Sequence, residues 1–181
     1  MSEQLIERIR NKDQLAMNQL YREYIGLLSS VCYRYVPMED DVKDILQNSF
    51  IKIFTSISAL EYRGEDAFRN WMVRVVVNEA LLFLKNRKKL QYTDVGTATL
   101  QQIADEGEPE IERLSSAELH QLISELPDGY RTVVNLYVFE GYSHKEIAKL
   151  LNITESTSAS QLFNAKRLLE KKIRKMLEGR K

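Results

Sequence analysis

The spacing of apolar residues predicts helices through the first half of the chain. Apolar side chains recur three or four residues apart along residues 13–36, until Pro37 interrupts the pattern. A similar segment covers residues 39–60 and begins with three acidic residues, which suit the positive end of a helix dipole. A third covers residues 67–90, where helical spacing outweighs a short β-branched run. We therefore predict three helices that pack on one another.

The periodicity is lost after this segment. From residue 92 the chain carries glycines, a proline and small or acidic side chains, a composition typical of a linker between packed units. Helical spacing returns along residues 111–126, which end at Pro127, and along residues 129–140. The sequence thus predicts an all-α fold with two small helical domains joined by a flexible linker. The first domain, the linker and the second domain are expected at residues 1–91, 92–110 and 111–181.

Residues 143–169 have the pattern of a helix-turn-helix. Ser143 and Glu146 have the spacing of a capping box at the start of an apolar stripe. Asn152 suits a left-handed turn position, and Thr154 can cap a second helix. An amphipathic helical hairpin also suits plain core packing, so this pattern alone leaves DNA binding and core packing both open.

The second helix of such a motif enters the major groove of DNA, while the first crosses the backbone. This geometry would place Lys145 near phosphates. It would also bring the small or amide side chains of Ser158, Gln161 and Asn164 to base edges.

The chain has no net charge, because 26 Lys and Arg residues balance 26 Asp and Glu residues. Nucleic-acid binding would therefore depend on local basic clusters rather than on an overall positive field. One cluster lies at residues 85–89 and another along residues 166–181, with acidic residues between them. The single cysteine, Cys32, excludes an intramolecular disulfide and favours a core position in an intracellular protein.

Enzymatic and membrane functions have no motif in this sequence. There is no glycine-rich phosphate loop or nucleophile elbow, and His144 and Glu146 do not have the spacing of a zinc-protease helix. Residues 1–10 lack the apolar run of a secretion signal, and no stretch is long enough to cross a bilayer. We therefore expect a cytoplasmic protein that is not an enzyme, with no cofactor, metal, small-molecule substrate or membrane insertion.

Three stretches resemble the extracytoplasmic-function (ECF) group of bacterial sigma factors, within the sigma-70 family. Residues 126–148 closely resemble the fourth domain of that group. Residues 40–50 are similar to its core-polymerase-binding helix, and residues 68–78 resemble the helix that opens and reads the promoter element nearest the start site. The two domains match in the expected order without a middle domain, so the resemblance covers nearly all of the chain.

The resemblance implies a three- to four-helix bundle in the first domain and the helix-turn-helix in the second. It also implies that the first domain binds a coiled coil in the largest subunit of RNA polymerase. Asp44, Gln47 and Phe50 match the family pattern, with Phe50 expected to face the domain core. Helical spacing places Asp41, Asp44 and Asn48 on one face. The residues expected to bind core polymerase are Asp40, Asp41, Asp44, Gln47 and Asn48.

Contacts with promoter DNA are implied in both domains. The polar break at residues 62–66 and the helix after it would capture bases extruded from the stack, although Phe68 and Trp71 also suit core packing. At Ala159 many relatives carry a basic residue, which suggests a distinct sequence preference. The residues expected at the minus-ten element are Arg63, Glu65, Phe68, Asn78, Lys85, Arg87 and Lys88. Those expected at the minus-thirty-five element are Lys145, Ser158, Ala159, Ser160, Gln161, Phe163, Asn164 and Lys166.

The sequence therefore predicts an alternative sigma factor that binds core RNA polymerase, recognises a two-part promoter and helps to open it. Group membership adds an anti-sigma factor as an expected partner. One alternative is a conventional helix-turn-helix regulator, against which the Asp-x-x-Gln pattern at residues 44–47 argues. Another is an adaptor that sequesters a protein partner, against which the recognition helix and the basic C-terminal end argue.

Overall fold

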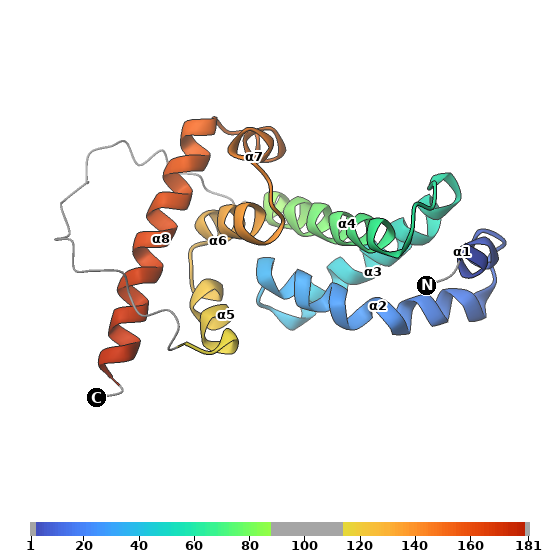
Figure 1. The fold of residues 1–181 in the computed structure, drawn as a ribbon, viewed down its shortest axis with the longest axis horizontal. Coiled ribbons are helices and arrows are strands. Elements are labelled where there is room, and N and C mark those ends of the chain that lie inside the picture. Colours follow the sequence, from blue (N-terminus) through green and yellow to red (C-terminus); the bar gives the residue numbers. More distant parts are fainter. Residues whose placement is uncertain (1–2, 88–113, 180–181) are drawn as a thin grey trace. The chain divides into compact units, whose positions relative to one another are not determined.

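The computed structural model describes residues 3–87 and 114–179. The chain divides into two compact units, residues 1–87 and 88–181. Every regular element in the described ranges is helical (Figure 1), which confirms the prediction of an all-α fold. None of the helices in these ranges is both long and apolar enough to span a membrane. The predicted linker, residues 92–110, lies outside the described residues.

The first unit contains the three predicted helices, which pack on one another in pairs, together with an additional N-terminal helix. Its elements are α1 (Glu3–Arg10), α2 (Gln14–Tyr35), α3 (Glu39–Ser56), the short 3₁₀ helix η1 (Ile57–Ala59) and α4 (Glu65–Asn86). Asp13 caps α2, because its carboxylate accepts hydrogen bonds from the backbone N–H groups of Leu15 and Ala16 at 2.9 and 3.2 Å. The capping explains why α2 begins where the apolar periodicity begins.

Helix α1 has no counterpart in the sequence-based prediction. It is only eight residues long, and isolated helices of this length are marginal in water. Leu5, Ile6 and Ile9 are buried, and α1 contacts α2 and η1. Tertiary packing on these two elements therefore stabilises α1.

The core of the first unit lies between α2, α3 and α4. Leu28, Ile53 and Met72 are completely buried, one from each helix. Cys32 is also completely buried, as predicted, and burial raises the pKa of its thiol to about 12. The cysteine is thus a structural core residue.

Four leucines of the apolar stripes predicted along residues 13–36, 67–90 and 143–151 lie at the surface, namely Leu15, Leu27, Leu82 and Leu150; the first and third of these are the most exposed. Leu15 is 75% exposed and Leu82 is 46% exposed. Successive residues of an α-helix are rotated by about 100°. The buried stripes pass through the neighbouring Ala16 and Leu81 instead, so the pattern was displaced by one residue at these two positions.

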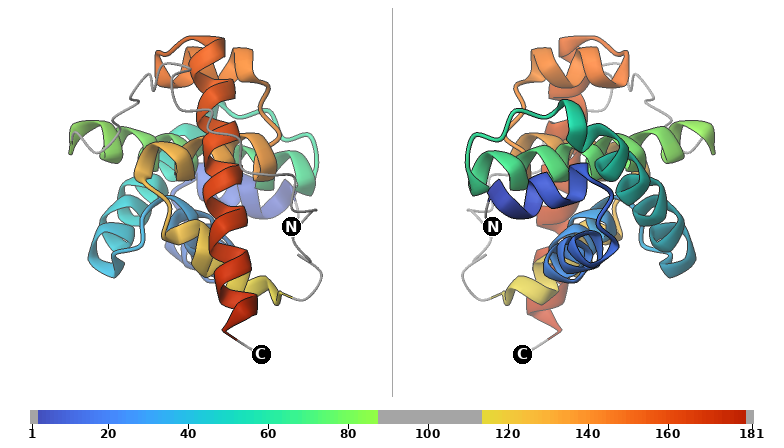
Figure 2. Two further views of the ribbon diagram at one scale, coloured as in Figure 1. Left: turned by 90° about the vertical axis from the view of Figure 1, so that its left-hand side faces the viewer. Right: turned by 90° about the vertical axis from the view of Figure 1, so that its right-hand side faces the viewer.

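The second unit is built along its longest helix, α8, which contacts α5, α6 and α7 (Figure 2). Its elements are α5 (Ser116–Ser124), α6 (Asp128–Val134), the π-helical turn η3 (Asn135–Phe139), α7 (His144–Leu151) and α8 (Glu155–Glu178). The predicted helix at residues 129–140 therefore divides into α6 and a wider π-helical turn.

The predicted helix-turn-helix is confirmed as α7, a tight turn and α8. Ser143 and Glu146 form both hydrogen bonds of the capping box at the start of α7. Asn152 ends α7 in the left-handed conformation, with φ of 56° and ψ of 50°. The Thr154 hydroxyl then accepts a hydrogen bond of 3.0 Å from the backbone N–H of Thr157 at the start of α8.

Candidate functional site

The solvent side of α3 carries four of the five residues predicted to bind polymerase. Asp40, Asp44, Gln47 and Asn48 are all exposed. Ile51, one turn after Gln47, is 54% exposed and adds an apolar side chain to the same helix. We call these five residues the α3 edge, which presents carboxylates, amides and one apolar group to solvent.

Asp41 departs from the exposed face on which helical spacing placed it. It is 6% exposed and shares the buried stripe of α3 with Ile45 and Ser49, each four residues further along. Its carboxylate forms an ion pair of 2.9 Å with Arg87, whose guanidinium also lies 4.5 Å from the ring centroid of Phe83. The pair joins the start of α3 to the end of α4, so Asp41 does not belong to the α3 edge.

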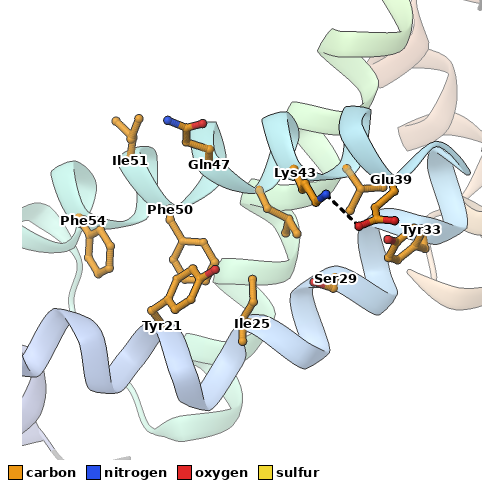
Figure 3. A pocket seen from close by; sticks show the side chains of 12 residues that line it. Tyr21, Ile25, Ser29, Tyr33, Glu39, Lys43, Gln47, Phe50, Ile51 and Phe54 are labelled. Carbon is orange, nitrogen blue, oxygen red and sulfur yellow. Dashed lines mark ion pairs between the residues drawn. The ribbon is translucent and has the colours of Figure 1, made fainter.

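A groove of about 520 Å³ lies between α2 and α3, beside the α3 edge (Figure 3). Tyr21 and Phe50 face each other within it, with ring centroids 4.7 Å apart. Gln47 also lines the groove, as do Glu39 and Lys43, which form an ion pair of 2.8 Å. The hydrogen bond from Lys43 lowers the pKa of the Glu39 carboxyl. The groove therefore combines an aromatic interior with polar and charged groups at its margin.

A second pocket, of about 280 Å³, lies at the loop between η1 and α4. Tyr62 and Arg63 line it from the loop, and Phe68 lines it from the first turn of α4. Arg63 forms an ion pair of 2.7 Å with Glu61, and Gly64 ends the loop with a φ of 100° that favours glycine. We call this the loop pocket. Its aromatic, cationic and anionic groups can together hold a planar ring that has polar edges.

Phe68 is both a core residue and a wall of the loop pocket. It is 2% exposed, so its predicted alternative of core packing is confirmed. Its ring lies 6.3 Å from those of Tyr24 and Tyr62 and 5.5 Å from that of Trp71, measured between centroids. Glu65 is exposed at the start of α4, with its carboxylate 3.5 Å from the Tyr24 hydroxyl. These contacts fix the aromatic wall before any ligand binds.

Two further predicted minus-ten residues share one side of α4. Asn78 and Lys85 are exposed and lie two helical turns apart, so they face the same way. Arg87 is engaged with Asp41, as described above. Lys88 lies outside the described residues. The structure thus offers an amide and a cation along α4, in the part of the helix that follows the residues of the loop pocket in the sequence.

Ser158 and Gln161 are buried in α8, although the sequence placed them at base edges. They are 0% and 3% exposed. The hydroxyl of Ser158 lies 2.9 Å from Nδ1 of His144 in α7, which joins the two helices of the motif. Gln161 shares a buried stripe with Thr157 and Ala165, four residues before and after it. Both side chains therefore belong to the packed interior of the second unit, and the described conformation does not support base contacts by them.

The other predicted minus-thirty-five residues are accessible to solvent. Lys145, Ala159, Phe163 and Lys166 are exposed, while Ser160 and Asn164 are half-buried. Phe163 is 49% exposed, and the guanidinium of Arg167 lies 5.8 Å from its ring centroid. An aromatic ring at the surface of a recognition helix is available to a partner, because its own unit does not cover it.

Two arginines that shape these units have no signal in the sequence. Arg131 is 4% exposed and donates hydrogen bonds of 2.9 Å to the carbonyl oxygens of Ser124 and Leu126, which fixes the turn before α6. Arg10 ends α1 and donates to the backbone carbonyl of Leu60, 50 residues away, beside the loop pocket. The spacing of apolar residues in α1 could have indicated a helix, but it could not have indicated this long-range contact.

Comparison with known proteins identifies the family across both units. Residues 20–90 match sigma-70 region 2, and residues 116–169 match sigma-70, region 4. The ECF RNA polymerase sigma-E factor of Haemophilus influenzae is 32% identical over 188 residues, which cover 96% of this chain and 95% of that protein. The ECF RNA polymerase sigma-E factor of Escherichia coli K12 is 31% identical over 193 residues, which cover 98% and 99%.

The fold is also found in a solved structure. The sigma factor RpoE of Bartonella quintana, in complex with the anti-sigma factor NepR, is similar with a TM-score of 0.50 and 16% identity. The match covers 85% of this chain and 94% of that chain, and it concerns the fold alone. Family membership comes from the relatives that are 31% and 32% identical along nearly their whole length. The chain therefore belongs to the ECF group of the sigma-70 family, whose members direct RNA polymerase to promoters.

Proposed function

We propose that this chain binds core RNA polymerase through the α3 edge and the adjoining groove between α2 and α3. The observation that carries the proposal is the pairing of polar and apolar groups at this place. Asp44 and Gln47 offer hydrogen-bonding groups beside an aromatic interior that contains Tyr21 and Phe50. Protein interfaces combine an apolar centre with a polar margin in the same way. Asp41 instead holds α3 to α4 through Arg87.

The two units divide the work of promoter recognition. Residues 1–91 bind polymerase and the minus-ten element, residues 111–181 bind the minus-thirty-five element, and residues 92–110 link them. The division of the chain into compact units at residues 87 and 88 supports this arrangement. The matches to sigma-70 region 2 and region 4 support it independently.

The loop pocket holds a base extruded from the minus-ten element. Extrusion of a base costs a few kcal/mol of lost stacking and pairing. Stacking on a protein aromatic ring returns roughly 1–3 kcal/mol per base. Tyr62 and Phe68 provide the aromatic wall, while Arg63 and Glu61 provide a donor and an acceptor for the edge of the base. Asn78 and Lys85, on one side of α4, contact the adjoining strand.

The outer face of α8 reads the minus-thirty-five element. Asn164 offers an amide to a base edge, and Ala159 and Phe163 offer apolar contacts of the kind made with a thymine methyl group. Lys145 and Lys166 contact phosphates, which contributes affinity without sequence preference. Ser158 and Gln161 are outside this contact set because they are buried.

We infer the remaining features of the function, with group membership as their support. The chain acts in the cytoplasm as a dissociable initiation factor and catalyses no bond change itself. An anti-sigma factor binds the chain and keeps it inactive until transcription from its promoters is required. A bound anti-sigma factor and core polymerase would compete for the chain if both used the α3 edge.

Transcription with purified components tests the function. The chain is added to core RNA polymerase that has been freed of sigma factors, with fragmented genomic DNA as template, and the transcript starts are mapped. We expect transcripts that begin downstream of one shared two-part sequence. Active core polymerase without any such transcripts would overturn it, and DNA binding by the chain without core would then favour a conventional helix-turn-helix regulator.

A further inference from the structure

The loop pocket is tied to α1 by one side chain. Nη2 of Arg10 donates a hydrogen bond of 2.6 Å to the carbonyl oxygen of Leu60, and Nε donates to the carbonyl oxygen of Ile57 at 3.4 Å. Nη1 of the same guanidinium forms an ion pair of 3.0 Å with Glu7, one turn earlier in α1. Three nitrogens of one planar group are therefore engaged at once, two of them with the backbone that leads into the loop.

Burial of α1 fixes the position from which Arg10 reaches the loop. Leu5, Ile6 and Ile9 are 5%, 1% and 3% exposed, so this face of the helix is fully packed. Arg10 is the last residue of α1, and its side chain is 31% exposed. A guanidinium that is partly shielded from water and held by Glu7 loses less freedom on binding the two carbonyls than a free one would.

The two ends of the loop are held in different ways. At its start, Arg10 binds the carbonyl of Leu60, whose own N–H donates to the Ile57 carbonyl at 3.3 Å. At its end, Gly64 adopts a positive φ, and its carbonyl accepts a hydrogen bond of 3.1 Å from the N–H of Phe68 in α4. The pocket-lining residues 61–63 lie between these two anchors. Their position depends on Arg10 at one end and on α4 at the other.

We infer that Arg10 is a positioning residue for base capture: it fixes the start of the loop so that Tyr62 and Arg63 form the pocket before DNA arrives. The inference rests on the proposed function of the loop pocket. Arg10 acts through the backbone of Leu60. Preorganisation of this kind raises affinity because the loop is ordered before binding rather than during it.

The test uses the full chain in complex with core polymerase, with forked promoter DNA taken from the mapped transcripts. In a series of forks, each single-stranded base of the minus-ten element is replaced in turn by an abasic site, and the dissociation constants are measured. For the unchanged chain, one position is expected to weaken binding roughly five-fold or more when its base is removed, which corresponds to the loss of one stacked base.

Three variants separate positioning from general stability. Arg10→Ala is expected to reduce the penalty at that position to less than two-fold, because the disordered pocket no longer distinguishes a base from an abasic site. Arg10→Lys keeps the charge but cannot span both carbonyls, so we expect an abasic site at that position to weaken binding to an intermediate extent. This variant replaces Arg10→Ala in the test if Arg10→Ala does not fold. Arg8→Ala is the matched control: it removes the same charge from the same helix, and Arg8 pairs with Asp13 instead of the loop.

Two results would overturn the inference in distinguishable ways. If Arg10→Ala and Arg10→Lys weaken binding to all forks equally and leave the abasic penalty unchanged, Arg10 has only a structural role, while the loop pocket stands. If the unchanged chain shows no penalty at any position, the proposed loop pocket fails, and the inference fails with it.

Discussion

The ion pair between Asp41 and Arg87 gives the most direct test of how the first unit is held together. Loss of one member of a fully buried pair costs about 3–5 kcal/mol, whereas exposed pairs contribute about 0–1 kcal/mol. The side chain of Asp41 is 9% exposed and that of Arg87 is 49% exposed, so this pair lies between the two cases. We expect Arg87→Gln to lower the free energy of unfolding by about 2 kcal/mol.

A double-mutant cycle measures the interaction itself. The single variants Arg87→Gln and Asp41→Asn are compared with the double variant during urea unfolding. Trp71 is the only tryptophan of the chain and lies in α4, so its fluorescence reports on the first unit. We expect a coupling energy of about 1 kcal/mol between the two sites. Additive effects, within about 0.3 kcal/mol, would refute the argument that this pair joins α3 to α4.

The same variants separate a structural role for Arg87 from a role on phosphate. A side chain that neutralises one phosphate lowers the slope of log affinity against log salt concentration by about 1 when it is removed. Lys85→Gln is the matched variant, because Lys85 is exposed on the same helix. We expect Lys85→Gln to reduce the salt slope of promoter binding by the holoenzyme and Arg87→Gln to leave it unchanged. An equal reduction by both variants would place Arg87 on the DNA.

Three further predictions concern single residues. Asn164→Ala is expected to change the preference for minus-thirty-five sequences by about 1–3 kcal/mol at one base pair. Gln161→Ala is expected to destabilise the second unit and leave that preference unchanged. Binding to a library of upstream elements measures the sequence preference, and circular dichroism on heating measures the stability. The hydrogen bond from Arg8 and the N–H groups of α2 lower the pKa of Asp13 below its usual 3.8, so the stability that this carboxylate contributes is present above that pH and is lost as the pH falls through its folded-state pKa. Unfolding followed by Trp71 fluorescence should therefore show that Asp13→Ala is less stable than the unchanged chain at pH 7, and that this difference narrows below about pH 4. A difference in stability that stays constant with pH would contradict the cap. Cys32 should react with a thiol reagent only after unfolding, because burial raises its pKa to about 12 and shields it; rapid labelling of the native chain would contradict its core position.

Long apolar periodicity made the fold largely predictable. Helix α2 begins and ends within one residue of the predicted positions, because Asp13 and Pro37 are local signals for its start and its end. Ser143 and Asn152 likewise defined α7 through side-chain and backbone preferences that need no tertiary contact. Helix α1 was not predicted, although Leu5, Ile6 and Ile9 have helical spacing, because a helix of only two turns is marginal by itself and its stability comes from packing.

The candidate sites were less predictable than the fold, because spacing identifies a helix face but not the neighbour that covers it. Asp40 and Asp41 are adjacent in sequence, yet one is exposed and the other meets Arg87 from 46 residues away. Gln161 suits a base edge by chemistry, but the packing of the second unit buries it. The role of Arg10 depends on a contact across 50 residues, which no local pattern encodes.

The affinity of a double variant for core polymerase tests the central claim, that the α3 edge is the polymerase-binding surface. Asp44→Ala combined with Gln47→Ala removes two exposed polar groups from the α3 edge. The matched control combines Gln19→Ala with Glu23→Ala, which are exposed on α2 and do not line the groove. We expect the α3 variant to bind core polymerase about ten-fold or more weakly, while its unfolding and the affinity of the control stay unchanged. Unchanged affinity of the α3 variant, or an equal loss in the control, would contradict the claim.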